Sequence, residues 1–83
     1  MSATSPELIK ATVRKFLEEN MPGVELADDT LLISNRLMDS IVALKLVSHL
    51  ETAFNIEFEA HEVDQDNLDS INVITAFTVR KCQ

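Results

Sequence analysis

The sequence predicts an all-α fold, a small bundle of three main helices, one short helix and a long first loop. Its 83 residues contain one Gly and two Pro, and Leu, Ile, Val, Ala, Glu and Lys are frequent. This composition favours helices over a turn-rich β fold. Three stretches also repeat apolar residues at helical spacing, each after a residue that can cap a helix. We expect residues 1–83 to form a single domain.

The first helix is predicted over residues 4–20, "TSPELIKATVRKFLEEN". Ser5 or Thr4 can cap it, and Pro6 suits its first position. Pro22-Gly23 ends it. Side chains at helical spacing form one stripe along this helix: Leu8, Ile9, Thr12, Val13, Phe16 and Leu17.

Residues 21–38 then form a loop that is long for so small a domain. Its apolar side chains predict that it packs over the core: Leu26, Leu31, Leu32, Ile33 and Leu37.

The second helix is predicted over residues 39–54, with Asp39 as its cap. A helical wheel assigns these side chains to the core: Val42, Ala43, Leu46, Val47, Leu50, Ala53 and Phe54. Ile41 and Leu44 fall outside that face, near Lys45, Ser48 and Glu51. Two apolar side chains on an outer face indicate a contact surface for another protein. The alternative is that the long loop covers them.

The chain after the second helix, "NIEFEAHEVDQDN", is acidic and weakly periodic, and one short helical turn is expected at residues 63–67. Asp69 is the expected cap of a final helix over residues 70–81. Arg80 and Lys81 lie near the negative end of that helix. Its apolar side chains are Ile71, Val73, Ile74 and Phe77.

Charge and cysteine content exclude several classes of function. The formal net charge is −7, and residues 51–69 hold seven acids and no Lys or Arg, so nucleic acid is not an expected partner. The acidic segment either steers a basic protein surface or is a solvated surface. The single Cys82 fits a reducing cytoplasm. The start of the chain lacks a signal peptide, and no apolar run reaches the roughly 18 residues of a membrane span.

The sequence supports neither catalysis nor a metal site. Ser40 would need a base to act as a nucleophile, but His49 faces the opposite side of the helix and His61 has no evident link to it. The G-x-S-x-G elbow is absent. "DQDNLDS" lacks the Gly and the final Glu of a calcium loop, and His49, His61 and Cys82 have no ligand spacing.

The tripeptide Asp-Ser-Ile occurs at residues 39–41 and again at residues 69–71. A serine in the first turn of a helix is well placed to carry a phosphate, because free N–H groups and the helix dipole favour negative charge there. This argument applies to Ser40 and to Ser70 alike.

The stretch "LMDSIVALKLVSHLETAFNIEF" resembles the acyl and peptidyl carrier proteins. Their signature is Asp-Ser-Leu, or a similar apolar residue, at the head of the second helix, followed by a Val/Leu-rich helix that ends in Glu-x-x-Phe-x-Ile. Here it is carried by Asp39-Ser40-Ile41 and then by Leu44, Leu46, Val47, Leu50, Glu51, Phe54 and Ile56. The later "DNLDSINVITAF" resembles the start of the fourth helix of that family, so the resemblance covers residues 8–81.

This resemblance implies a four-helix carrier bundle that is not an enzyme. It implies that a phosphopantetheinyl transferase attaches 4′-phosphopantetheine from coenzyme A to Ser40, that Asp39 assists this transfer, and that cargo then rides as a thioester on the terminal thiol. Cys82 is not that thiol. The family's partner-facing positions fall on Ile41, Leu44, Lys45 and Ser48. An adenylate-forming acyl or amino acid ligase would load the carrier, and a transferase or synthase would use the cargo.

The chain departs from fatty-acid-synthase carriers near Ser40. Arg36, Leu37 and Met38 precede Asp39, and Lys45 stands where those carriers tend to have Glu. We therefore expect docking through apolar contacts and a role in specialised, natural-product type biosynthesis. We also expect the carrier to be a monomer. The Met1 start suggests a free-standing protein. Two alternatives are an unmodified helical adaptor and a housekeeping fatty-acid or D-alanyl carrier; the adaptor would tolerate substitution of Ser40.

Overall fold

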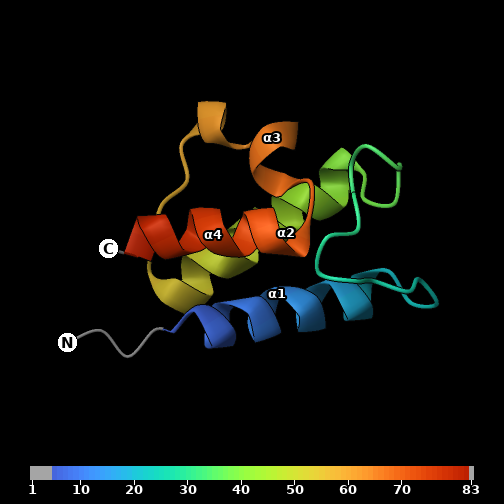
Figure 1. Cartoon of the computed structure of the whole chain (residues 1–83). Helices are drawn as coiled ribbons and strands as arrows, with labels where there is room; N and C mark the ends of the chain where they lie inside the picture. Colours follow the sequence, from blue (N-terminus) through green and yellow to red (C-terminus); the bar gives the residue numbers. More distant parts are fainter. Residues whose placement is uncertain (1–4, 83) are drawn as a thin grey trace.

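The computed structural model describes residues 5–82, which form an all-helical bundle without strands in that range (Figure 1). In chain order its elements are α1 (Pro6–Asn20), α2 (Ser40–Phe54), the 3₁₀ turn η1 (Ala60–Glu62), α3 (Gln65–Leu68) and α4 (Ile71–Cys82). The predicted all-α class with three main helices is confirmed. Thr4, the alternative cap of the first helix, lies outside the described residues. Between residues 5 and 82, no helix has the length and apolarity that a bilayer span requires.

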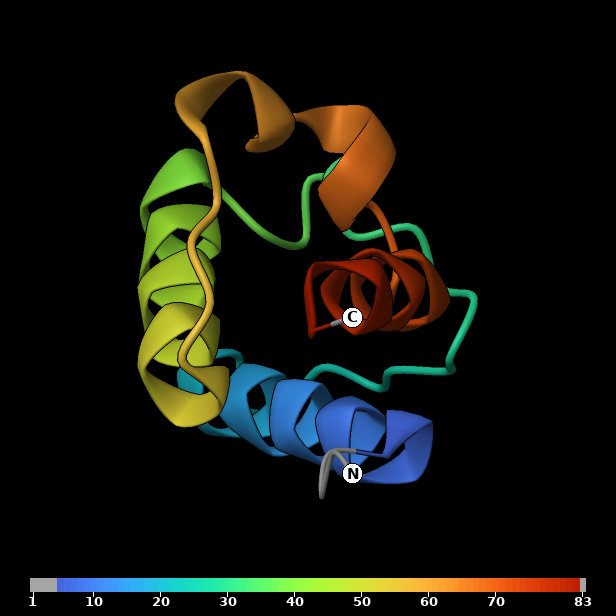
Figure 2. The same cartoon turned by 90° about the vertical axis from the view of Figure 1, so that its left-hand side faces the viewer.

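The helices surround α4. Figure 1 shows α1 and α4 side by side and running in opposite directions, so that the start of α1 and the end of α4 lie at the same end of the bundle. Figure 2, which looks along α4, shows α2 on the left, α1 below, and η1 and α3 above. The most extensive helix contacts of α4 are with α1 and α3, and α1 also contacts α2.

α1 begins where the sequence predicts. The Ser5 hydroxyl oxygen accepts a hydrogen bond from the Leu8 N–H at 3.1 Å, and Pro6 is the first helical residue. Ile9, Val13 and Leu17 are almost fully buried. Leu8, expected in the same stripe, is 49% exposed, because it lies at the solvent edge of the buried face. The helix ends before Gly23, whose φ of +84° favours glycine.

α2 begins at Ser40 with Asp39 as its cap, as predicted. Four of the predicted core side chains are buried, and Val42 and Phe54 are half-buried. Ala53 is exposed, so its assignment to the core was wrong. It lies near the end of α2, where no other element covers it, whereas Leu50 is buried. The buried side chains are Ala43, Leu46, Val47 and Leu50.

The long loop packs over the core, as predicted. Leu32 is fully buried and Met38 is 2% exposed, and Leu26 and Ile33 are half-buried. The prediction was wrong for Leu31, which is 45% exposed. The Leu32 N–H donates to the Asp69 carbonyl at 2.6 Å, which fixes Leu32 inward and leaves its neighbour on the solvent side.

Asp69 does not cap α4. Its carboxylate accepts hydrogen bonds from the N–H groups of Ile33 and Ser34, at 2.8 and 2.9 Å, and from the Ser34 hydroxyl. These bonds, with that of the Ser34 hydroxyl first, lower the pKa of Asp69. The cap is instead Ser70, whose hydroxyl oxygen accepts from the Val73 N–H at 3.1 Å. α4 therefore begins at Ile71, one residue later than predicted.

The first half of the loop is fixed to α1 by Asp28. Its carboxylate pairs with Lys10 at 3.1 Å and with Arg14, and Arg14 also donates to the Leu26 carbonyl at 2.7 Å. The Asn72 N–H donates to the Asp28 carbonyl at 3.0 Å, which links this point to α4. The bonds from Arg14 and Lys10 lower the pKa of Asp28.

The segment between α2 and α4 holds two short helical turns, where the sequence predicted one at residues 63–67. α3 begins at Gln65, because the Asp64 carboxylate caps it through the Asn67 N–H at 3.0 Å. The preceding turn η1 is held by the Glu62 carboxylate, which accepts from the Glu59 N–H and from Lys81 of α4. These bonds lower the pKa of Glu62. The bond between Glu59 and Glu62 is local, whereas Lys81 lies 19 residues away in sequence and its contact with η1 could not be predicted from spacing.

Candidate functional site

Ser40 is the first helical residue of α2 and is exposed. The Asp39 carboxylate before it accepts a hydrogen bond from the Val42 N–H at 2.9 Å, and the Asp39 carbonyl accepts from the Ala43 N–H at 3.0 Å. Asp39 therefore fixes the start of α2 without using the Ser40 hydroxyl. The free N–H groups and the dipole at this helix end favour a negatively charged group on Ser40.

Ser70, the serine of the second Asp-Ser-Ile tripeptide, has different surroundings. Its side chain is 4% exposed, and its hydroxyl oxygen is engaged as the cap of α4. The two serines were equivalent in the sequence argument. The structure separates them, because only the Ser40 side chain is both exposed and at a helix start.

The loop before Ser40 is anchored at both ends of its last turn. The N–H groups of Leu37 and Met38 donate to the Leu32 carbonyl at 2.8 and 3.0 Å, and Leu32 is itself bonded to Asp69. Met38 is buried two residues before Ser40. Ser40 therefore follows directly after a hydrogen-bonded turn that is packed against the core.

The histidines are not placed to activate Ser40. His49 stacks on Phe16 of α1, with ring centroids 5.1 Å apart. His61 lies beside Glu59, at 3.7 Å, in the η1 segment. Among residues 5–82, no group of three or more His, Cys, Asp or Glu side chains could hold a metal ion. The geometry around Ser40 therefore fits an attachment point better than a hydrolytic site.

Ile41 and Leu44 are 63% and 59% exposed, and Lys45 and Ser48 on the same helix are also exposed. The long loop does not cover this face, so the alternative that it covers Ile41 and Leu44 is wrong. Glu51 is half-buried, and its carboxylate accepts a hydrogen bond from the Phe58 N–H at 2.8 Å. The outer face of α2 next to Ser40 therefore combines two large apolar side chains with one cation.

A groove of about 270 Å³ lies beside Ser40, between the end of the long loop, α2 and α3. Ser40 and Leu44 are on its rim, while Met38 and Leu68 are buried beneath it. Sequence reasoning missed this groove, because Val63 and Leu68 come from a segment whose turns were misplaced. A group attached to Ser40 would start at the edge of an apolar surface.

One of three comparisons with known proteins identifies a family for this chain. A family model described as "Phosphopantetheine attachment site" matches residues 7–77, which covers most of the chain. No curated protein matches the chain. No solved structure matches it either.

Proposed function

The chain belongs to the phosphopantetheine attachment-site family, whose members carry 4′-phosphopantetheine covalently on a serine, and we propose that this serine is Ser40. Carrier domains of this family are not enzymes. They interact with a phosphopantetheinyl transferase and with biosynthetic enzymes. The protein is therefore a phosphopantetheine-bearing carrier, and the assignment of Ser40, its partners and its pathway are the substance of the proposal.

The exposure of Ser40 at the start of α2 is the observation that supports this proposal most strongly. A transferase must reach the serine hydroxyl from outside. Ser40 is exposed, whereas Ser70 is 4% exposed and engaged as a cap. A phosphodiester at the N-terminus of α2 would also be stabilised by the helix dipole. The residues around Ser40 thus fit the group.

The attachment requires little of the chain itself. The Ser40 oxygen forms a bond to the β-phosphorus of coenzyme A, the pyrophosphate bond breaks, and adenosine 3′,5′-bisphosphate and the hydroxyl proton leave. The transferase supplies the catalysis. Asp39 holds the helix end through Val42, so the hydroxyl keeps its position as the enzyme approaches.

The bound arm supplies a terminal thiol that holds acyl or aminoacyl cargo as a thioester. Cys82 is half-buried at the end of α4, away from Ser40 in sequence and in the fold, and we assign it no part in carrying cargo. The tether raises the effective concentration of cargo at each partner.

We assign partner recognition to Ile41, Leu44, Lys45 and Ser48. Their exposure next to Ser40 supports this, because an enzyme that acts on the arm must contact the chain nearby. The proposed partners are the transferase, an adenylate-forming acyl or amino acid ligase, and a downstream transferase or synthase. We take the carrier to act in the cytoplasm as a single-domain monomer.

Specialised, natural-product type biosynthesis is the proposed setting. The outer face of α2 offers Ile41, Leu44 and the cation of Lys45, and Glu51 is occupied by Phe58, so this face is not acidic. A partner for such a face would rely on apolar contact rather than on a basic patch. The family match favours a carrier over an unmodified adaptor.

Intact mass spectrometry after incubation with coenzyme A and a broad-specificity phosphopantetheinyl transferase tests the attachment site. The wild-type chain should gain one phosphopantetheine, and Ser40→Ala should gain none. Ser70→Ala is the matched control and should be loaded like the wild type. Because Ser70→Ala removes a cap worth about 1 kcal/mol, its folding is checked by circular dichroism.

Loading of Ser40→Ala, or loss of loading in a folded Ser70→Ala, would overturn the assignment of Ser40. Incubating the loaded carrier with adenylate-forming ligases and candidate acids would then identify the cargo. Leu44→Ala should slow the loading of cargo by the ligase while leaving the free energy of unfolding nearly unchanged.

A further inference from the structure

Asp69 holds the second half of the long loop from the start of α4. Its carbonyl accepts a hydrogen bond from the Leu32 N–H at 2.6 Å, and its carboxylate accepts from the N–H groups of Ile33 and Ser34, at 2.8 and 2.9 Å. The Ser34 hydroxyl also donates to this carboxylate, and it accepts from the Gln65 amide of α3 at 2.8 Å. One aspartate therefore fixes three consecutive loop residues and links them to α3.

The loop residues that Asp69 holds are bonded in turn to the chain just before Ser40. The Met38 N–H donates to the Leu32 carbonyl at 3.0 Å, and Met38 is 2% exposed. Asp39 follows as the cap of α2, and Ser40 is the first residue of that helix. Leu32 and Met38 thus connect Asp69, by hydrogen bonds, to the start of α2.

The same bonds shape the groove of about 270 Å³ beside Ser40. Ile33 lines this groove from the loop, Gln65 lines it from α3, and Ser40 lines it from α2. Both Ile33 and Gln65 are held by the pair of Ser34 and Asp69. Loss of the Asp69 carboxylate would therefore release the loop and α3 on the side of α2 where Ser40 lies.

On the basis of the proposed attachment at Ser40, we propose that Asp69 is a positioning residue for the loading step. It acts through the loop, because its bonds go to residues 32–34 and not to Ser40. The transferase must bring the Ser40 oxygen into line with the β-phosphorus of coenzyme A, and a misplacement of about 1 Å can slow such a step about 100-fold. By holding the loop, Asp69 keeps the hydroxyl in place.

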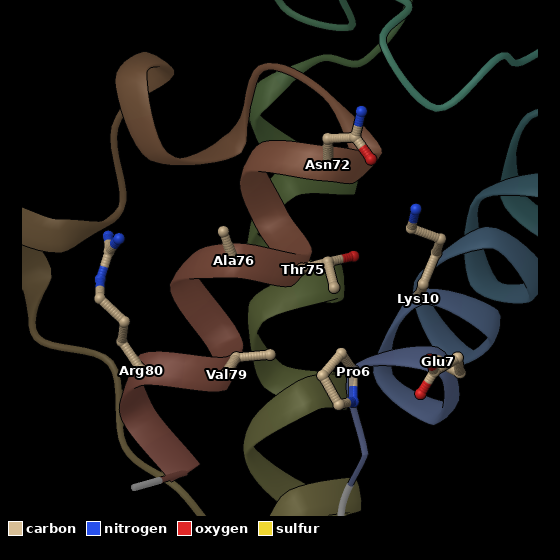
Figure 3. A pocket seen from close by; sticks show the side chains of 8 residues that line it. All are labelled: Pro6, Glu7, Lys10, Asn72, Thr75, Ala76, Val79 and Arg80. Carbon is tan, nitrogen blue, oxygen red and sulfur yellow. The ribbon is translucent and has the colours of Figure 1, made fainter.

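Asp28 offers a matched control in the first half of the same loop. Its carboxylate also ties the loop to a helix, through Lys10 at 3.1 Å and through Arg14. Lys10 and Asn72, which donates to the Asp28 carbonyl, line a second groove, of about 480 Å³, between α1 and α4 (Figure 3). Figure 3 shows α2 behind α4 in this view, so this groove opens away from α2. The bonds of Asp28 thus hold the loop without reaching residues 32–40.

The test measures kcat and KM of a phosphopantetheinyl transferase with the full chain as substrate, by intact mass over time. Asp69→Ala should lower kcat about tenfold, because the Ser40 hydroxyl is no longer held in place. Alanine fits the backbone of residue 69, whose φ is −83°. Asp69→Asn keeps an oxygen that can accept from the loop N–H groups, and should restore most of kcat. Asp28→Ala should leave kcat unchanged.

The split between kcat and KM separates positioning from a merely structural role. A variant that is partly unfolded has a smaller share of binding-competent carrier, which raises the apparent KM and leaves kcat at saturation unchanged. Positioning predicts the reverse: KM should stay within about twofold, because the exposed face of Ile41 and Leu44 is intact. Circular dichroism checks that each variant is folded.

Amide hydrogen exchange of the unloaded chain tests the path without the transferase. In Asp69→Ala the Met38 amide should exchange faster relative to the Leu50 amide of α2, and in Asp28→Ala this ratio should be that of the wild type. An unchanged ratio in Asp69→Ala, an unchanged kcat, or an equal fall of kcat in Asp28→Ala would overturn the role of Asp69. Failure of the wild type to load, or loading of Ser40→Ala, would instead refute the attachment at Ser40 and this role with it.

Discussion

At the scale of single residues, the same tripeptide does two different jobs. In α2 the cap is the aspartate, so the following Ser40 is the first helical residue and its hydroxyl is not needed by the fold. In α4 the cap is the serine, so Asp69 is released to bind the loop at Ile33 and Ser34. A shift of one residue in the helix start thus decides which Asp-Ser pair exposes a serine.

Asp39 has two separable roles, as a helix cap and as part of the modification motif. Asp39→Ala should lower the free energy of unfolding by about 1 kcal/mol in urea denaturation, because the Val42 N–H loses its acceptor. Asp39→Asn keeps a capping oxygen and should retain most of that stability. If Asp39 also assists the transfer, Asp39→Asn should still slow the loading of Ser40 in the mass assay. Normal loading of a stable Asp39→Asn would limit Asp39 to capping.

Arg36 has a left-handed backbone, with φ of +59°, in the turn closed by the bond from its N–H to the Ile33 carbonyl at 3.0 Å. This conformation costs a residue with a Cβ roughly 1 kcal/mol, and glycine avoids that cost. Part of the gain is offset, because glycine loses more conformational entropy on folding. Arg36→Gly should therefore raise the free energy of unfolding by about 0.5 kcal/mol. Arg36→Ala removes the exposed side chain but keeps the conformational cost. Equal urea midpoints for the two variants would contradict this account.

At the scale of elements, α2 presents two apolar faces with different functions. Leu46 is fully buried between α2 and the rest of the bundle, whereas Leu44, two residues earlier, is 59% exposed next to Ser40. Burial of apolar surface stabilises the fold, and apolar surface left in water is available to a partner. The wheel of α2 predicts this division, because successive residues turn by about 100°.

Alanine substitutions on these two faces should have opposite consequences. Leu46→Ala should lower the free energy of unfolding by about 2–5 kcal/mol, a large part of the stability of so small a domain. Leu44→Ala should change it by less than about 0.5 kcal/mol and should instead slow loading by the transferase. Urea denaturation and the loading rate measure the two effects. A strongly destabilised Leu44→Ala would mean that Leu44 belongs to the core.

At the scale of the whole molecule, three carboxylates hold the irregular segments to the helices. Asp28 ties the first half of the long loop to α1, Asp69 ties its second half to the start of α4, and Glu62 ties η1 to Lys81 at the end of α4. Their hydrogen bonds lower the pKa of each group in the folded chain. The positions of the long loop and of η1 against the helices therefore depend on these carboxyl groups being ionised.

This dependence predicts loss of stability in acid. A carboxyl group with a lowered pKa stabilises the fold above its unfolded pKa, near 4, and this contribution is lost as pH falls through the lower folded value. The urea midpoint should thus decrease below about pH 4.5. Asp69→Asn should be less stable than the wild type at pH 7 and should show a shallower decrease. Asp66→Asn, an exposed acid of α3, is the control; the same slope for wild type and Asp69→Asn would contradict the role of Asp69.

The sequence by itself determined the all-α class, the starts of α1 and α2, the inward packing of the long loop and the division of α2 into two faces. These features depend on local spacing and capping, which the order of residues contains. The tertiary structure alone decided that Asp69 binds a loop 35 residues away rather than capping α4, that η1 forms against Lys81, and that the two grooves exist. Such features require contacts between segments distant in sequence. The spacing of residues along the chain does not show which carboxylate will bond to which donor.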